Sequence, residues 1–281
     1  MSSESALTRW RREIVDGCTI YERPATAEHV AGPPVLFLNG CALAAAGWMP
    51  VIDRLPDHDV LAIDRPGFAG TQWPGVLPEL PTEVEMVERA IADHPEAVIV
   101  AHSMASLGTE AYARLHPDRV AGIVLVDPSV EDYSTRGPVG RFARSTWLPM
   151  LHGVTAQAGV ARFASWLVHC GFARQSASGR ALDRTAFKDP YRDSEALTAS
   201  AAEWLSYRSQ GADLEVLRSV TDIVTTPTSV LAAPPLPDPR RMQILRESFS
   251  DLTFNEIGDS KHLMMVDRPD VIAEAVAAVS R

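Results

Sequence analysis

Short apolar runs alternate along the chain with segments of helical periodicity. Four such runs precede residue 128, at residues 35–38, 60–63, 97–100 and 123–126. Continuous apolar runs of this length fit strands that are buried on both faces, as in a parallel sheet. Helical periods separate them, as at residues 82–93 and 104–116, and residues 8–24 alternate as an edge hairpin does. The pattern predicts an α/β fold with a mostly parallel central sheet and helices on both faces.

The pattern changes after residue 128. Residues 129–222 hold amphipathic segments and no strand-like run, and a strand pattern returns only at residues 227–231. A helix, a strand and a closing helix are then expected at residues 239–249, 252–257 and 269–279. We therefore predict an α/β core of residues 1–128 and 223–281 that carries a helical cap, residues 129–222.

A serine stands where a buried strand passes directly into a helix. Ser103 follows the third apolar run, and small residues, Ala101 and Ala105, flank it two positions away. Small neighbours allow the strand and the helix to cross closely, which exposes the serine on a strained turn. The helix N-terminus favours the negative charge that develops when the hydroxyl attacks a carbonyl. Ser103 is therefore the candidate nucleophile, and a helix-capping serine is the alternative without function.

A histidine follows the last expected strand and is the candidate general base. His262 ends a short loop that begins at Gly258. A neutral imidazole can accept the proton of a serine hydroxyl near neutral pH. His102 adjoins the nucleophile, but the sharp turn is expected to aim it away from Ser103, which indicates a structural role.

Together these segments resemble the successive signatures of α/β-hydrolases. The resemblance rests on residues 35–41, 64–68, the Ser103 turn, 122–128 and 258–262, in that order. It implies the α/β-hydrolase fold, with the insertion placed where these enzymes carry a helical cap. It also implies an oxyanion hole made by the backbone N–H groups of Cys41 and Met104. Asn39 stands where the family usually has histidine.

The resemblance offers two places for the acid that orients the base. One is Asp127, at the end of the sixth strand, and the other is Asp238, after the seventh. The prolines before Asp238 limit how that loop can bend back. Asp127 lies 24 residues after Ser103, as in relatives that use the strand-six acid. We favour Asp127 and keep Asp238 as the alternative. In the interpretation without a catalytic role, Asp127 only forms a turn before proline.

Composition narrows the remaining possibilities. A formal net charge of −10 disfavours nucleic acid as a partner. No apolar run reaches the roughly 18 residues of a membrane span, and the polar N-terminus lacks a signal-peptide core. Three scattered cysteines fit neither a disulfide framework nor a zinc site. We expect a cytoplasmic protein without metal or cofactor, and the oligomeric state stays open.

The expected activity is hydrolysis of an uncharged, largely apolar ester, lactone or related acyl compound through an acyl-enzyme. Leu43 and Trp48 are expected to wall the acyl site. For Trp166 of the cap two interpretations stay open: it roofs the pocket, or it packs in the core of the cap. A serine nucleophile disfavours the epoxide hydrolases and dehalogenases of this fold, which use a carboxylate. Acyl transfer, iminopeptide cleavage and cofactor-free perhydrolysis remain alternatives on the same triad. A ligand-binding protein with little turnover is a further alternative.

Overall fold

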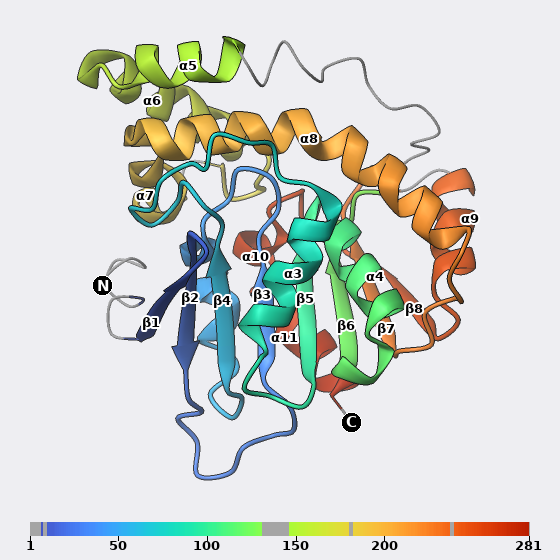
Figure 1. The fold of residues 1–281 in the computed structure, drawn as a ribbon. Helices are drawn as coiled ribbons and strands as arrows, with labels where there is room; N and C mark the ends of the chain where they lie inside the picture. Colours follow the sequence, from blue (N-terminus) through green and yellow to red (C-terminus); the bar gives the residue numbers. More distant parts are fainter. Residues whose placement is uncertain (1–6, 8–9, 131–145, 180–181, 237–238, 281) are drawn as a thin grey trace.

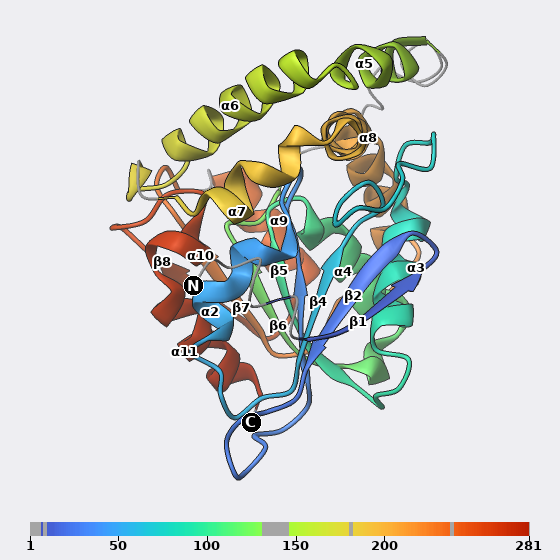
Figure 2. The ribbon, with the colours of Figure 1, turned by 90° about the vertical axis from the view of Figure 1, so that its left-hand side faces the viewer.

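The structure is a computed structural model of the 281-residue chain. It describes residues 7, 10–130, 146–179, 182–236 and 239–280. Figures 1 and 2 show a central sheet with helices on both faces and a group of helices above one end of it.

The sheet has eight strands in the order β1-β2-β4-β3-β5-β6-β7-β8. The first two strands form an antiparallel edge hairpin that pairs with β4, and β3 to β8 run parallel to one another. The strands are β1 Arg11–Val15, β2 Cys18–Arg23, β3 Val35–Leu38, β4 Val60–Asp64, β5 Ala97–His102, β6 Val120–Val126, β7 Thr228–Ala232 and β8 Leu252–Glu256. The predicted fold class is confirmed.

Alternate residues of the central strands enter two different cores. On one side, Val98 and Val100 of β5 pack with α2 and α11. On the other side, Ile99 and Ala101 of the same strand pack with α3 and α4. Successive side chains of a strand point to opposite faces, so a sheet covered on both faces needs apolar residues at every position. The helices are α2 Met49–Ile52, α3 Leu80–Ala90, α4 Ala105–Leu115, α9 Pro239–Ser248, α10 Met264–Asp267 and α11 Pro269–Val279.

The insertion is helical in its described residues. It contains α5 Leu148–Thr155, α6 Ala158–Arg174, α7 Arg184–Phe187 and α8 Ser194–Arg218. Helix α8 crosses above the edge of the sheet where the parallel strands end, and α5 and α6 form the outermost layer above it (Figures 1 and 2). The helices were predicted, whereas the division into two domains stays a prediction.

Two short 3-10 helices were not predicted, one between β3 and β4 and one in the insertion. A 3-10 helix, η1 (Ala45–Trp48), leads directly into α2, and both are buried. Another 3-10 helix, η5 (Asp189–Arg192), joins α7 to α8.

In the described part of the chain, no helix is both long and apolar enough to cross a membrane.

Candidate active site

Ser103 occupies a strained turn between β5 and α4. Its φ angle is 51°, in the left-handed region that non-glycine residues rarely adopt. Hydrogen bonds hold the turn, because the Ser103 N–H donates to the Val126 carbonyl at 3.1 Å and the Ser103 carbonyl accepts from the Ser106 hydroxyl at 2.7 Å. Ala101 and Ala105 are buried on either side. Larger side chains at these two positions would push the strand and the helix apart.

His262 and Asp127 lie together at the end of the sheet where the parallel strands finish, as Ser103 does. The Nδ1 atom of His262 is 2.5 Å from Oδ2 of Asp127, and both side chains are partly exposed. The second carboxylate oxygen of Asp127 accepts from the Ala233 N–H at 3.1 Å. A carboxylate that accepts from Nδ1–H fixes the tautomer in which Nε2 is free to accept a proton. The pair therefore has the geometry of a general base with its orienting acid.

The backbone of Asp127 is also strained. Its φ angle is 43°, and its N–H donates to the Leu231 carbonyl of β7 at 2.7 Å. Two polar residues at the ends of adjacent parallel strands, Ser103 after β5 and Asp127 after β6, thus share an unfavourable conformation. Such strain persists only where the surrounding structure imposes it, and it is concentrated at functional sites.

His102 joins the Ser103 turn to the loop that carries His262. Its Nε2 lies 2.8 Å from the main-chain carbonyl of His262, so this nitrogen carries the proton. Burial and the neighbouring His262 hold the pKa of His102 well below its usual range, which keeps the ring neutral. The contact shows what a structural role of His102 consists of: its side chain supports the backbone of His262.

The loop after β3 passes very close to Ser103. A Cβ atom added at Gly40 would lie 2.4 Å from Nδ1 of His102 and 3.1 Å from Cβ of Ser103. Only glycine fits without displacing one of them. The next N–H, that of Cys41, and the N–H of Met104 donate to no group in the described residues. Two free donors beside the serine are what an oxyanion hole requires.

The cap helices hold this loop through its backbone. The Ala42 N–H donates to the Glu203 carboxylate of α8 at 2.6 Å, and the Ala42 carbonyl accepts a short hydrogen bond from the Tyr191 hydroxyl. From the other side, Arg65 donates to the Asn39 carbonyl at 2.7 Å. The loop that carries Cys41 is therefore fixed by both the sheet and the cap.

Glu203 is a buried carboxylate that shares the positive charge of Arg65 with Glu83. Arg65 forms its ion pair with Glu83 at 2.7 Å, and no described Lys, Arg or His side chain forms an ion pair with Glu203. Burial raises the pKa of Glu203 to about 7, although Arg65 and the Ala42 N–H oppose the shift. The sequence did not single out Glu203 or Tyr191, because both stand among helical residues with no motif around them.

The three predicted pocket residues have different environments. Leu43 and Trp48 are almost completely buried, at 5% and 1% exposure, and the Trp48 ring meets His102 edge-on at 6.4 Å between centroids. They support the site from the core. Trp166 lies on the outward side of α6, half-exposed and stacked on Phe163. This outward position does not support the roof role of Trp166. The sequence could not show it, because helical periodicity does not tell which apolar side of a helix turns inward.

Other predicted features can also be placed. Asp238, the alternative acid, lies outside the described residues. Burial raises the pKa of the Cys41 thiol well above its usual value, so a reactive thiolate is disfavoured and the backbone role remains. Within the described ranges, no three His, Cys, Asp or Glu side chains are grouped as metal ligands.

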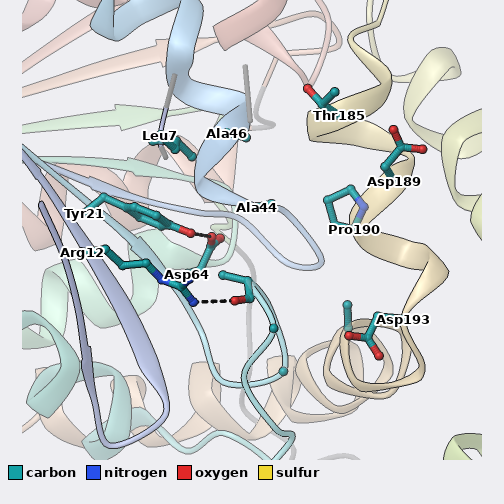
Figure 3. A pocket seen from close by; sticks show the side chains of 14 residues that line it. Leu7, Arg12, Tyr21, Ala44, Ala46, Asp64, Thr185, Asp189, Pro190 and Asp193 are labelled. Carbon is teal, nitrogen blue, oxygen red and sulfur yellow. Dashed lines mark hydrogen bonds between the residues drawn. The ribbon is translucent and has the colours of Figure 1, made fainter. Parts of the chain in front are cut away.

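A cavity of about 390 Å³ lies beside the loop after β3, between the edge hairpin and the cap (Figure 3). Ala44 and Ala46 line it, together with Asp64, which accepts from the Tyr21 hydroxyl at 3.1 Å. Its lining includes none of Ser103, His262 and Asp127. This cavity is therefore separate from the candidate triad.

Two curated proteins match part of this chain in sequence. A relative from Mycobacterium phage D29, named as a candidate non-heme haloperoxidase, is 30% identical over 40% of this chain and 42% of its own length. A haloalkane dehalogenase of Agrobacterium fabrum is 27% identical over 40% of each chain. The chain thus matches less than half the length of these curated relatives.

Solved structures show the same fold at low identity. A candidate epoxide hydrolase of Pseudomonas aeruginosa superposes with a TM-score of 0.73 at 16% identity, covering 97% of both chains. The enol-lactonase of Burkholderia xenovorans LB400 gives 0.66 at 18% identity, covering 96% of this chain and 99% of that one. The sequence model of the alpha/beta hydrolase fold family matches residues 33–269. The chain therefore belongs to the α/β-hydrolase family of enzymes.

Proposed function

We propose that this enzyme is a serine hydrolase that uses Ser103, His262 and Asp127 as its catalytic triad. The observation that carries the proposal is the 2.5 Å contact between His262 Nδ1 and the Asp127 carboxylate, at the edge of the sheet where the strained Ser103 turn lies. The two strands that carry Ser103 and Asp127 are direct neighbours in the sheet. These features together support a nucleophile, a base and an orienting acid.

The chemistry follows from the roles of these groups. The Ser103 oxygen attacks the substrate carbonyl while His262 accepts the hydroxyl proton, and the N–H groups of Cys41 and Met104 hold the resulting oxyanion. Collapse of this intermediate breaks the acyl bond, and His262 passes its proton to the leaving group. Water then attacks the acyl-serine with His262 again as base, which releases the acid and restores Ser103.

The proposed substrate is an uncharged, largely apolar ester, lactone or related acyl compound. Leu43 and Trp48 follow the loop that carries Cys41 and are buried in the hydrophobic core, so the interior next to this loop is apolar. The enol-lactonase of Burkholderia xenovorans LB400 shares the fold, which is compatible with a lactone substrate. A serine nucleophile disfavours the dehalogenation and epoxide hydrolysis named for other relatives, because those reactions use a carboxylate in this fold.

A second candidate activity is cofactor-free perhydrolysis on the same triad. Here hydrogen peroxide replaces water in the attack on the acyl-serine and the product is a peracid. The relative named as a candidate non-heme haloperoxidase is the observation that favours it. Both activities require Ser103, so they differ only in the acceptor of the acyl group.

A panel of p-nitrophenyl esters of increasing acyl length tests the proposal. We expect turnover by the wild type and a loss of kcat of at least about a thousandfold in Ser103→Ala, because the nucleophile of a triad is removed. Ser219→Ala, an exposed serine at the end of α8, is the matched control. A folded Ser103→Ala enzyme with wild-type rates would contradict the proposal.

A further inference from the structure

The outermost cap helix is apolar on both of its sides. Its inner side is anchored, because the Ser165 hydroxyl donates to the Lys188 carbonyl at 2.6 Å and Phe172 packs on Phe187 with ring centroids 5.6 Å apart. The opposite side of α6 carries Phe163, Trp166 and Leu167, which are 60%, 49% and 49% exposed. A surface helix of a globular protein normally turns a polar face outward.

These outward residues form one continuous apolar face. Positions three and four apart on a helix lie on the same side, and Phe163, Trp166 and Leu167 have this spacing. The rings of Phe163 and Trp166 stack with centroids 5.8 Å apart. Helix α5, in the same outer layer (Figure 2), adds the exposed Met150 and Val154. We call these five residues the outer apolar face.

The stretch of sequence that contains this face is opposite in charge to the rest of the chain. Residues 133–182 contain six arginines and no aspartate or glutamate, whereas the rest of the chain has 20 basic and 36 acidic residues. In the structure, Arg162 and Arg174 are exposed on α6. Neither pairs with an acidic group in the described part of the chain.

We propose that the outer apolar face of α5 and α6 docks on an anionic lipid surface. Helices that lie in a membrane interface combine exposed Trp, Phe and Leu side chains with arginine or lysine and lack acidic residues. Anionic headgroups attract arginines, and the apolar side chains enter the boundary between headgroups and acyl chains. The charge favours this occupant over a second copy of the acidic chain. The proposal goes beyond the hydrolase activity and does not depend on Ser103.

Vesicle co-sedimentation of the full chain tests this proposal. We expect binding to vesicles of phosphatidylcholine with about a third phosphatidylglycerol, at least about tenfold stronger than to phosphatidylcholine alone and weakened by high salt. The double variant Phe163→Ser/Trp166→Ser should lower the partition coefficient by about tenfold or more. Val216→Ser/Val220→Ser is the matched control, because both valines are exposed beyond the outer apolar face, at the end of α8.

A charge variant separates the two contributions. Arg162→Glu/Arg174→Glu should remove the preference for anionic vesicles and leave circular dichroism and ester turnover unchanged. The proposal is overturned if the wild type does not sediment with anionic vesicles, or if the Phe163 and Trp166 variant binds as the wild type does. It is also overturned if light scattering shows a lipid-free dimer that this variant makes monomeric, because a second copy then covers the face.

Discussion

At the scale of single residues, the candidate site consists of strained and crowded positions that support one another. Ser103 and Asp127 both adopt positive φ angles, and His102 ties their surroundings to the His262 loop. The sequence could predict Ser103 and His262, because a serine between small residues and a histidine after the last strand are local signals. It could only favour Asp127, since the contact with His262 joins residues 135 positions apart.

Asp127→Asn is the residue-level test of the acid. An amide favours the wrong imidazole tautomer, and such a change costs up to about 10⁴ in kcat, so we expect a loss of at least about tenfold relative to Asp238→Asn. Steady-state kinetics on a p-nitrophenyl ester measure both variants, with circular dichroism to check folding. A crippled Asp238→Asn beside a nearly normal Asp127→Asn would reverse the assignment.

Gly40→Ala tests the crowding next to the nucleophile. The new methyl group has no room at 2.4 Å from the His102 ring, so the loop after β3 or the His102 ring that supports His262 must move. Misplacement by about an ångström can cost about 100-fold in rate, and we expect kcat to fall by at least about tenfold. Gly159→Ala on α6, where a Cβ meets open space, is the matched control. Equal rates for the two variants would show that the close approach of Gly40 is not required.

At the scale of elements, the strands were predictable and the contacts between elements were not. Every position of β5 is buried and apolar up to His102, so the run of apolar residues marks the strand directly. Glu203 shows the opposite case. A glutamate within a long helix normally faces water, but the crossing of α8 over the loop after β3 buries it against Ala42. Such burial depends on tertiary packing, which leaves no local pattern in the sequence.

Glu203→Gln tests this buried carboxylate through the pH dependence of stability. The folded state raises the pKa of Glu203 from 4.5 to about 7, so it holds the proton more tightly than the unfolded chain does. Between these values the contribution of Glu203 to wild-type stability falls as pH rises. Glutamine does not titrate and still offers an acceptor to Ala42. We therefore expect the Tm of Glu203→Gln, relative to wild type, to increase from about pH 5 to about pH 8.

Thermal unfolding measured by circular dichroism at both pH values gives this difference. Asp64, whose pKa burial raises to about 6, titrates in both proteins, and only its charge interaction with Glu203 differs between them. Glu215→Gln, on the same helix, controls for the loss of a charge. A Tm difference that is the same at both pH values would show that Glu203 does not titrate in this range.

At the scale of the whole molecule, the order of elements was predictable and the packing of the cap was not. The order of apolar runs and helical periods predicted the sheet, and the family match over residues 33–269 agrees with it. The cap helices are apolar on more than one side, so the sequence could not show that Trp166 faces outward while Tyr191 and Glu203 contact Ala42 in the loop after β3. The cytoplasmic location stays a prediction.

The most direct test of the central claim is covalent labelling of the intact protein with a fluorophosphonate, followed by peptide mapping. Such a probe reacts with a serine that a neighbouring base activates. We predict one adduct, on Ser103, that is absent in Ser103→Ala and forms much more slowly in His262→Ala. An unlabelled wild type, or an adduct that persists in Ser103→Ala, would contradict the assignment of Ser103 as the nucleophile.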